Sequence, residues 1–321
     1  MAQKWKKRQK YKKKVNGWSV FLGVLLFCGA CFLTLGDLLE WENVPTMSSV
    51  KDTVFGPNTL TGEVENDCEV HFIDVGQGDS TLILSDGQAI LIDAGENDQG
   101  KVVVDYLEKL GIKKLDLIFM THPHSDHIGG MDDVIRAFDI GKIVAPRLPD
   151  SQVPTTKTYT EVLTAIAEKG LKMTPAKVDD TYTFGKGVFT ILGPMGQYED
   201  LNDTSLVCRF VYDQSRSFLF TGDMESPVEK ELVQSGKILK SDVLKLGHHG
   251  SKTSTSKGFY QAVDPDYAVI LVGDGNDYGH PHQKVLQTVE SNEASVYRTD
   301  YQGSIVFSIT QQNQFEIRVE R

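Results

Sequence analysis

The 321-residue sequence has few cysteines, no internal repeat and no low-complexity stretch beyond its first fourteen residues. Its four cysteines are too few for a disulfide scaffold. Hydrophobic residues make up 40% of the chain and charged residues 24%. This composition excludes an intrinsically disordered chain, a collagen-like fibre and a multi-pass membrane protein. The length allows one large domain or two ordinary ones.

Positive charge is scarce outside the N-terminus. Residues 1–14 hold eight of the 33 Lys and Arg residues and no acidic residue. Residues 15–321 hold 25 basic and 44 acidic side chains, a net charge of −19. Because general binding of nucleic acid needs a basic surface that neutralises phosphates, residues 15–321 are not expected to grip long duplexes.

Charge is absent from residues 18–36, whose sequence is WSVFLGVLLFCGACFLTLG. A helix of this length rises roughly 28 Å, enough to cross the hydrocarbon core of a bilayer. Cations precede the stretch and Asp37 and Glu40 follow it, so the positive-inside rule predicts a cytoplasmic N-terminus. A cleaved signal peptide is the alternative, but the apolar stretch is long for one and no clear small-x-small site precedes Asp37.

Composition divides the chain into four parts. Residues 1–14 are predicted to be a basic cytoplasmic head, 15–36 a single transmembrane helix, 37–65 a polar linker with proline and glycine, and 66–321 a folded domain. This arrangement predicts a single-pass protein of the cell membrane whose folded domain is extracytoplasmic.

Short apolar runs alternate with helical periods throughout residues 66–321. Helices are predicted at 101–110, 131–138, 160–169, 227–234, 257–263 and 283–291. Strands are predicted at 69–75, 80–84, 89–93, 115–120, 142–145, 181–184, 188–192, 205–212, 217–221, 243–246, 267–272, 295–297, 304–309 and 315–319. Many strands with interspersed helices predict sheets covered by helices, an α/β layered domain.

Histidine is uncommon but clustered. Only His71 stands alone, in the first predicted strand, where a core or surface role is expected rather than a ligand role. Each cluster follows a predicted strand or lies in a loop with glycine or proline, where functional residues usually lie. The other seven histidines form three groups: His122, His124 and His127; His248 and His249; His280 and His282.

The first group lies in the segment THPHSDHIGG, residues 121–130. It follows a predicted strand and leads into a predicted helix, so its side chains are expected to converge at a sheet edge. Neutral imidazoles and a carboxylate suit divalent cations such as Zn²⁺ or Mn²⁺. A solvated polar loop would not explain three histidines and an aspartate in six residues.

The HPHSDH segment resembles the HxHxDH signature of the metallo-β-lactamase superfamily. Further segments are similar to the extracellular domain of the ComEC family of competence DNA-uptake proteins and its stand-alone relatives, over about residues 68–310. They are FIDVGQGDS (72–80), LIDAG (91–95), NDTSLV (202–207), FTGD (220–223), LKLGHHGSKTSTS (244–256) and YGHPH (278–282). The resemblance implies an αββα sandwich with a metal site of one or two ions at one edge.

The resemblance also implies a role for each matching residue. His122 and His124 would bind a first cation, Asp126 and His127 a second, and Asp223 would bridge the two. One of His248 and His249 would complete the second site, and the other would contact substrate or orient a ligand. The catalytic residues would be Asp126, His249, and the pair His280 and His282, which would hold or protonate a leaving group.

One departure from the superfamily concerns the first cation. Many members supply a further histidine between HxHxDH and the bridging aspartate, but this chain has none between His127 and His248. Asp203 is expected to substitute as an oxygen ligand, or Asn202 to hydrogen-bond a bound water; a solvated turn is the alternative. A site richer in oxygen shifts the preference towards Mn²⁺ or Mg²⁺.

The remaining motif residues are expected to surround the ligands. Asp93 ends a strand and is placed to hydrogen-bond a ligating histidine. Asp74 and Asp79 flank a Gly-Gln-Gly turn, where each either contributes to the site or caps the turn. Ser251 and Lys252 follow the histidine pair, where a hydroxyl and a cation suit phosphate oxygens. The alternative for this segment is a helix N-cap.

Together these residues predict a membrane-anchored, extracytoplasmic metal-dependent hydrolase. The resemblance implies a phosphodiesterase or nuclease-like enzyme that uses a hydroxide activated by one or two Zn²⁺ or Mn²⁺ ions, with DNA among its substrates. One alternative is hydrolysis of a small or cell-wall phosphodiester, as in the similar phosphorylcholine esterases. Another is a surface binding protein without catalysis. No obligate protein partner is inferred; the membrane is contacted through the N-terminal helix.

Overall fold

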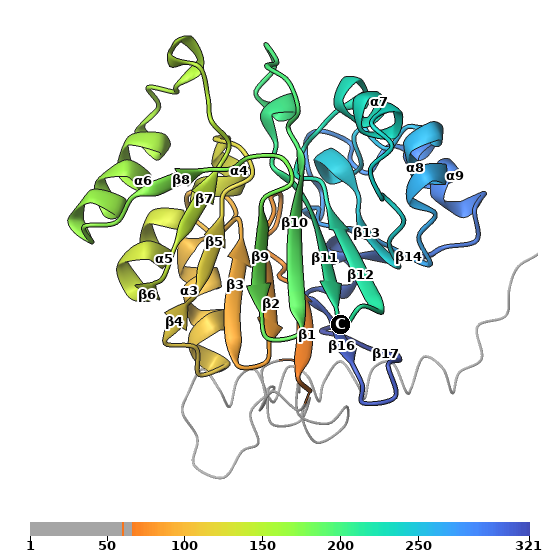
Figure 1. The fold of residues 1–321 in the computed structure, drawn as a ribbon, viewed down its shortest axis with the longest axis horizontal. Coiled ribbons are helices and arrows are strands. Elements are labelled where there is room, and N and C mark those ends of the chain that lie inside the picture. The colour runs from red at the N-terminus through yellow and green to blue at the C-terminus, as the bar shows by residue number, and fades with distance from the viewer. Residues whose placement is uncertain (1–59, 61–65) are drawn as a thin grey trace, which may run out of the picture. The chain divides into compact units, whose positions relative to one another are not determined.

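The computed structural model describes residue 60 and residues 66–321. The predicted head (1–14), anchor (15–36) and linker (37–65, apart from Leu60) lie outside the described residues. Among the described residues, no helix has the length and apolarity that crossing a membrane requires. Two β-sheets face each other between two layers of helices (Figure 1), so the predicted αββα sandwich is confirmed.

The first sheet has eight strands in the order β17-β16-β1-β2-β3-β5-β7-β8. Helices α3, α5 and α6 cover its outer face (Figure 1) and pack on it through buried aliphatic side chains. The strands are β1 (Cys68–Phe72), β2 (Thr81–Ser85), β3 (Gln88–Ile92), β5 (Leu117–Phe119), β7 (Ile143–Ala145), β8 (Met173–Pro175), β16 (Ile305–Ile309) and β17 (Phe315–Val319). The accompanying helices are α3 (Gly100–Lys109), α4 (Ser125–Ile128), α5 (Met131–Ala137) and α6 (Lys157–Glu168), and β4 (Lys114–Leu115) pairs with β6 (Asp139–Ile140).

The second sheet has seven strands in the order β15-β14-β13-β12-β11-β10-β9, and helices α7, α8 and α9 cover it (Figure 1). The strands are β9 (Thr181–Phe184), β10 (Gly187–Gly193), β11 (Val207–Tyr212), β12 (Arg216–Phe220), β13 (Val243–Lys245), β14 (Tyr267–Ile270) and β15 (Ser295–Arg298). The helices are α7 (Ser226–Gln234), α8 (Lys257–Val263), α9 (Gln283–Glu290) and α10 (Thr299–Gln302). Short 3₁₀ turns are η2 (Asp150–Gln152), η3 (Asn202–Thr204) and η4 (Gly247–Gly250).

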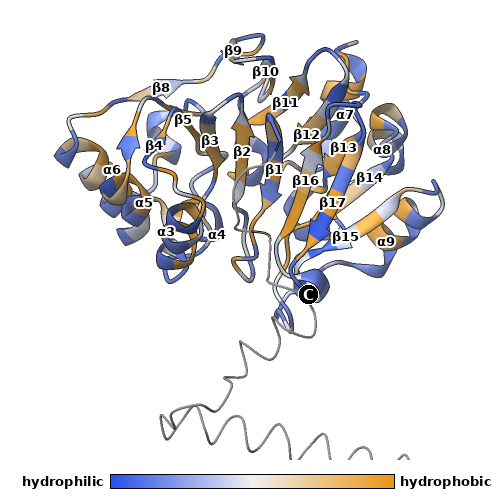
Figure 2. Ribbon diagram, turned by 90° about the horizontal axis from the view of Figure 1, so that it is seen from below, coloured by the Kyte–Doolittle hydropathy of each residue, from blue (hydrophilic) through white to orange (hydrophobic). Residues whose placement is uncertain are grey.

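Aromatic side chains fill the space between the two sheets. Phe72 of the first sheet meets Phe220 of the second, with ring centroids 6.2 Å apart, and Phe307 meets Phe218 at 6.1 Å. All four side chains are buried. Figure 2 shows the strands of both sheets largely in hydrophobic colours between the helix layers. Burial of these large apolar surfaces is the main term that holds the sheets together.

Strand direction places all the motif loops at one end of the sandwich. In the first sheet, β1, β3 and β5 run the same way, because β1 and β3 are each antiparallel to β2 and β5 is parallel to β3. In the second sheet, β10, β12, β13 and β14 share a direction for the same reasons. The loops that follow these strands carry the motif residues. Segments far apart in the sequence therefore meet at the carboxyl ends of the strands, the usual place for a site in such folds.

Candidate metal centre

A polar cavity of about 290 Å³ opens where these loops meet. Its lining combines residues from the loops after β1, β5, β10, β12, β13 and β14. The lining residues are Gln77, His124, Ser125, Asp126, Asn202, Asp223, His248, His249, Tyr278 and His280. Most of the residues predicted from the sequence are therefore brought to one place, although they come from both sheets.

The HPHSDH segment places two imidazoles against each other. His124 is the extended residue before α4, and its Nδ1 lies 3.0 Å from Nε2 of His122. The other ring nitrogen of His122 faces the hydroxyls of Thr121 and Ser205, at 3.2 and 3.3 Å. These hydroxyls hold the ring, so Nε2 of His122 and Nδ1 of His124 converge as the sequence predicts for a first cation. Ser205 is a positioning residue that the sequence argument did not single out.

Four further side chains form a tighter donor cluster: Asp126, His127, Asp223 and His249, each with a ligand atom within 4.8 Å of the others. Nε2 of His249 lies 3.2 Å from Asp126 Oδ2 and 3.5 Å from Asp223 Oδ2. Nε2 of His127 lies 3.2 Å from Asp223 Oδ1. Asp126 and His127 occupy the first turn of α4, and Asp223 follows β12. Two carboxylates and two imidazoles facing one point form a donor set that suits a divalent cation.

The structure separates the roles of the adjacent histidines His248 and His249. Both have left-handed backbones, with φ of 49° and 51°, which turns their side chains in different directions. Nδ1 of His249 lies 2.9 Å from the carbonyl oxygen of Leu271, so its Nε2 is directed into the donor cluster. Nδ1 of His248 lies 3.1 Å from Oε1 of Glu225, and its ring lines the cavity. His249 therefore belongs to the cluster, whereas His248 lines the cavity with its Nε2 3.7 Å from Asp223 Oδ2.

A buried aspartate orients the cluster from outside. Asp93 has its Oδ2 2.8 Å from Nδ1 of His127 and accepts hydrogen bonds from the backbone N–H and hydroxyl of Thr121, at 2.8 and 2.6 Å. All three residues are buried. The sequence predicts that Asp93 hydrogen-bonds a histidine of the site, and that histidine is His127. The bond fixes the His127 ring so that its Nε2 faces Asp223.

A buried lysine next to the cluster was missed by the sequence argument. Lys245 ends β13, is only 2% exposed, and donates a hydrogen bond to the carbonyl oxygen of Gly222 at 3.1 Å. Its ammonium pairs with Asp79 and lies 3.9 Å from Oδ1 of Asp223. The signal was a lone cation in the apolar run VLKL directly before the histidine pair. A charge this deeply buried requires partners, and the aspartates of the site supply them.

The turn that carries Asp79 approaches the centre closely. Its backbone N–H donates to the carbonyl oxygen of Asp126 at 3.0 Å. A Cβ on Gly78 would lie 2.4 Å from that same oxygen, and the residue has φ of +152°, so glycine is needed there. Asp74, on the other side of the turn, accepts from the N–H of Gly76 at 3.1 Å and pairs with Arg321. Of the two alternatives, Asp79 reaches the site and Asp74 caps the turn.

Asn202 and Asp203, in the segment that replaces the missing histidine, also have different surroundings. Asn202 lines the cavity, and its buried Oδ1 has no hydrogen-bond partner among the described residues. Asp203 instead accepts a hydrogen bond from the backbone N–H of Glu225 at 2.9 Å, and burial raises its pKa. Asn202 is thus the oxygen donor that shares the cavity with His124, and Asp203 supports the loop that holds Glu225.

Three other predicted residues lie outside the cavity lining. Ser251 is buried and its hydroxyl is 2.9 Å from that of Thr253, which donates to Glu225 at 2.8 Å. Lys252 is exposed. His282 is the residue before α9, while His280 lies in the cavity wall. Ser251 therefore contacts the residue that holds His248 in place, through Thr253, and the phosphate-binding role expected of Ser251 and Lys252 has no support from this geometry.

His71 lies in the core, as the sequence argument favoured. It is fully buried in β1, with Nδ1 3.0 Å from the hydroxyl of Tyr106 and Nε2 3.3 Å from Glu69. It is not among the residues that line the cavity.

Charge in the donor cluster is balanced within the protein. Burial alone would lower the pKa of His249, but the carboxylates of Asp223 and Asp126 raise it to about 10. Burial also opposes the charged form of His127, yet Asp223 and Asp79 raise its pKa well above the usual range. Burial would raise the pKa of Asp223, but the charges of His127 and His249 hold it well below the usual range. In the metal-free protein, imidazolium groups therefore offset the carboxylates.

Atoms without hydrogen bonds show that a cation fits this cluster. Among the described residues, Nε2 of His127, Oδ1 of Asp223 and Oδ1 of Asp79 are buried and have no hydrogen-bond partner. Buried polar atoms are seldom left in this state without a function. A divalent cation bound by the cluster would satisfy the His127 and Asp223 atoms and replace the protons on the imidazoles.

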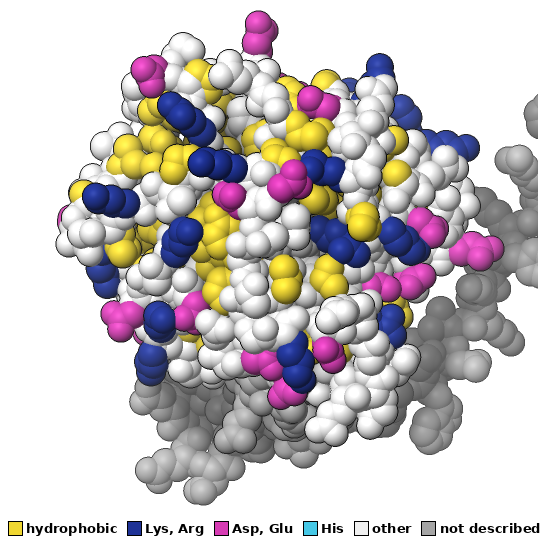
Figure 3. Space-filling view, viewed as in Figure 1, with side chains coloured by type: hydrophobic (Ala, Val, Ile, Leu, Met, Phe, Trp, Pro, Cys, Tyr) yellow, Lys and Arg dark blue, Asp and Glu magenta, His cyan; other side chains and the backbone are white. Residues whose placement is uncertain are grey.

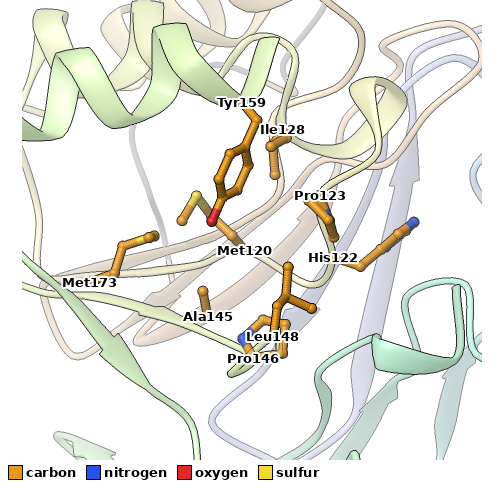
Figure 4. A pocket seen from close by; sticks show the side chains of 9 residues that line it. All are labelled: Met120, His122, Pro123, Ile128, Ala145, Pro146, Leu148, Tyr159 and Met173. Atoms are coloured by element: carbon orange, nitrogen blue, oxygen red, sulfur yellow. The ribbon is translucent and has the colours of Figure 1, made fainter. Parts of the chain in front are cut away.

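An apolar pocket of about 30 Å³ lies on the other side of His122. Figure 4 shows the imidazole pointing away from the pocket, with Pro123 and Leu148 beside it and Tyr159 further inside. On the face of the molecule drawn in Figure 3, hydrophobic side chains gather over β5, β7 and β8, with lysine and arginine side chains among them.

Burial and the nearby charge of His127 lower the pKa of His122 well below its usual range. The ring is therefore neutral, the form in which its nitrogen binds a metal.

Comparison with known proteins gives a consistent family. A family model described as the metallo-beta-lactamase superfamily matches residues 73–274. The chain is 34% identical over 257 residues to ComE operon protein 3 of Bacillus subtilis, covering 74% of this chain and 33% of that protein. It is 31% identical over 243 residues to Recombination protein 2 of Haemophilus influenzae, covering 74% of this chain and 28% of that protein. The chain thus spans about a third of the length of these curated relatives.

A solved structure shares the fold. Igni18, described as a metallo hydrolase from Ignicoccus hospitalis, aligns with a TM-score of 0.51 and 16% identity, over 75% of this chain and all of that one. At this level of identity, the similarity concerns the arrangement of sheets and helices alone.

Removing a carboxylate from the cluster should lower metal binding. We expect Asp223→Ala and Asp126→Ala each to reduce the affinity for Mn²⁺ or Zn²⁺ and to abolish hydrolysis. The loss of affinity should exceed the roughly 10–100-fold that is typical when a residue that hydrogen-bonds a metal ligand is removed. Asp74→Ala is the matched control, because that aspartate lies in the adjacent turn and outside the cavity lining. Metal content of the dialysed proteins measures the effect. If Asp223→Ala retained the metal content of the unchanged protein, the assignment of Asp223 would be wrong.

Metal binding should also depend on pH. His249, with a pKa raised to about 10, and His127, with its pKa raised, carry protons at neutral pH that a bound cation must displace. Affinity should therefore increase from about pH 6 to about pH 9, with release of protons on binding. Isothermal titration calorimetry in buffers of different ionisation enthalpy measures that release. A pH-independent affinity without proton release would contradict this charge assignment.

Proposed function

This chain belongs to the metallo-β-lactamase superfamily, and from that premise we propose that it is a metal-dependent phosphodiesterase. The observation that carries the proposal is the cavity itself, where the donor cluster lies beside neutral hydrogen-bonding side chains. Gln77 and Asn202 line it together with His248 and His280. Amide and imidazole groups donate hydrogen bonds to oxygen, so this wall suits the unesterified oxygens of a phosphodiester.

The relatives support the same substrate class. ComE operon protein 3, Recombination protein 2 and competence protein ComA of Neisseria gonorrhoeae carry names that refer to competence or recombination. These processes act on DNA, whose backbone is a phosphodiester. Hydroxyacylglutathione hydrolases also match, with 29% identity over 57% of the chain, so a thioester is the competing substrate class that the assay below must exclude.

Each side chain has a distinct part in the proposed reaction. Asp126, His127, Asp223 and His249 would hold one cation, and the converging nitrogens of His122 and His124 would hold another. When bound, such cations lower the pKa of water and polarise a phosphoryl oxygen. His248, fixed by Glu225, is placed to orient a substrate oxygen. Burial and the charges of His249 and His248 lower the pKa of His280 to about 4, so this ring is neutral and binds through hydrogen bonds.

The charge of the domain favours single strands or strand ends over duplex DNA. Residues 66–321 hold 24 basic and 38 acidic side chains, a net charge of −14, which opposes contact with a long run of phosphates. A local site with its own cations can still hold one phosphodiester. A small or cell-wall phosphodiester would meet the same requirement and is the second substrate class of the proposal.

We also propose that residues 18–36 anchor the enzyme in the cell membrane with its catalytic domain extracytoplasmic. The uncharged stretch behind eight cations supports this orientation. A reporter active only outside the cytoplasm, fused after residue 321, should be active. Activity of a cytoplasm-only reporter at the same position would contradict it.

A substrate panel tests the proposed chemistry. The full-length chain, purified in detergent, is given single-stranded DNA, duplex DNA, a teichoic-acid phosphodiester, a thioester, a lactone and nitrocefin, each with Mn²⁺, Zn²⁺ or EDTA. We expect metal-dependent cleavage of phosphodiesters, with Mn²⁺ at least as effective as Zn²⁺, and none by Asp223→Ala. Turnover of the thioester, lactone or nitrocefin without phosphodiester cleavage would overturn the proposal.

A further inference from the structure

An exposed aromatic ring stands at the edge of the cavity. Tyr278 lies in the loop between β14 and α9, lines the cavity and is 67% exposed. Large aromatic side chains are usually buried, and an exposed one at a site is typical of a contact surface. Within the cavity lining, Tyr278 is the large hydrophobic side chain that is left exposed.

The ring of Tyr278 contacts the ring of His280, which in turn lies near His249 of the donor cluster. The ring centroid of His280 is 5.6 Å from that of Tyr278 and 6.4 Å from that of His249. The planes within these two pairs differ by 23° and 26°, so each pair is close to parallel. Tyr278 is nevertheless 67% exposed, so its ring has surface available for a further flat group.

The loop that carries this stack is held firmly. The amide of Asn276 donates to the carbonyl oxygens of Gly273 and His280, at 2.9 and 2.7 Å, and accepts from the N–H of His280 at 3.0 Å. The N–H of Gly273 donates to Oε1 of Gln77 at 3.2 Å. A Cβ on Gly273 would lie 2.6 Å from the backbone nitrogen of Gln77, so the two loops are in close contact. The loop backbone that carries the ring is pre-organised, which reduces the entropy lost when a ligand stacks on it.

We propose that Tyr278 is a stacking platform for the base of a nucleotide whose phosphodiester lies at the donor cluster. This rests on the proposed phosphodiesterase function and narrows its substrate to nucleic acid strands. Bases stack on aromatic rings without regard to sequence, because each has a flat π-face. An aliphatic phosphodiester, such as one of glycerol phosphate, has no group that would use the platform.

A matched pair of tyrosines makes the test specific. Tyr301, in α10, is also 67% exposed, but it does not line the cavity and its ring is covered by the guanidinium of Arg298 at 3.9 Å. Tyr278→Ala and Tyr278→Phe are compared with Tyr301→Ala in the full-length chain. The ligands are a single-stranded oligodeoxynucleotide, an abasic oligonucleotide of the same length and a glycerophosphodiester.

Binding of the two oligonucleotides is first measured in EDTA by fluorescence anisotropy. Tyr278→Ala should weaken binding of the base-containing strand by about five- to a hundred-fold and leave the abasic strand unchanged. Tyr278→Phe and Tyr301→Ala should behave as the unchanged protein. The basic residues 1–14 contact both strands through phosphates, so their contribution cancels in the comparison. Equal binding of the two strands by the unchanged protein, or equal loss for both in Tyr278→Ala, would overturn the platform.

Kinetics with Mn²⁺ then separates the platform from the proposed function. Tyr278→Ala should raise KM for the base-containing strand with little change in kcat, and leave cleavage of the glycerophosphodiester unaltered. Cleavage that ignores the base and the Tyr278 substitution would overturn the platform while the phosphodiesterase stands. Base-dependent binding without any phosphodiester cleavage would sink the enzymatic proposal and leave the platform in place.

Discussion

A group of buried carboxylates that requires positive charge is the constraint on which the site depends. Asp79, Asp126 and Asp223 meet at one edge of the sandwich, where burial disfavours their charged forms. Lys245 supplies one permanent positive charge. His127 and His249 each add a positive charge when they are protonated, and a bound metal ion can replace those protons. The same geometry thus stabilises the metal-free protein and prepares it to exchange protons for a divalent cation.

The fold provides this concentration of charge at little conformational cost. Parallel strands end at the same edge of each sheet, so short loops after these strands bring the metal-binding side chains together. Aromatic packing between the sheets holds the two halves in register. Hydrogen bonds donated by the rings to Asp93 and Glu225 then fix His127 and His248, and these contacts decide which nitrogen of each ring faces the cavity.

The sequence predicted the layered fold and most of the donors because those features are local. The strand pattern and the HPHSDH segment can be read within a few residues, and Asp93 ends an apolar run, whereas the role of Asp223 was implied only by the family resemblance. The sequence could not separate His248 from His249, because adjacent residues share a motif and differ only in their partners, Glu225 for His248 and the Leu271 carbonyl oxygen for His249. It also expected Ser251 and Lys252 to bind phosphate oxygens, whereas neither residue is among those that line the cavity. Lys245 and Tyr278 were missed because their importance comes from partners in other loops.

We propose that Asp126, His127, Asp223 and His249 surround a divalent cation. Anomalous X-ray scattering from crystals grown with Mn²⁺ tests this assignment, because the signal locates the metal without reference to activity. We expect a peak enclosed by these four side chains and its loss in crystals grown with EDTA. A metal-saturated protein whose only peaks lie elsewhere, for example between His280 and His282, would contradict it.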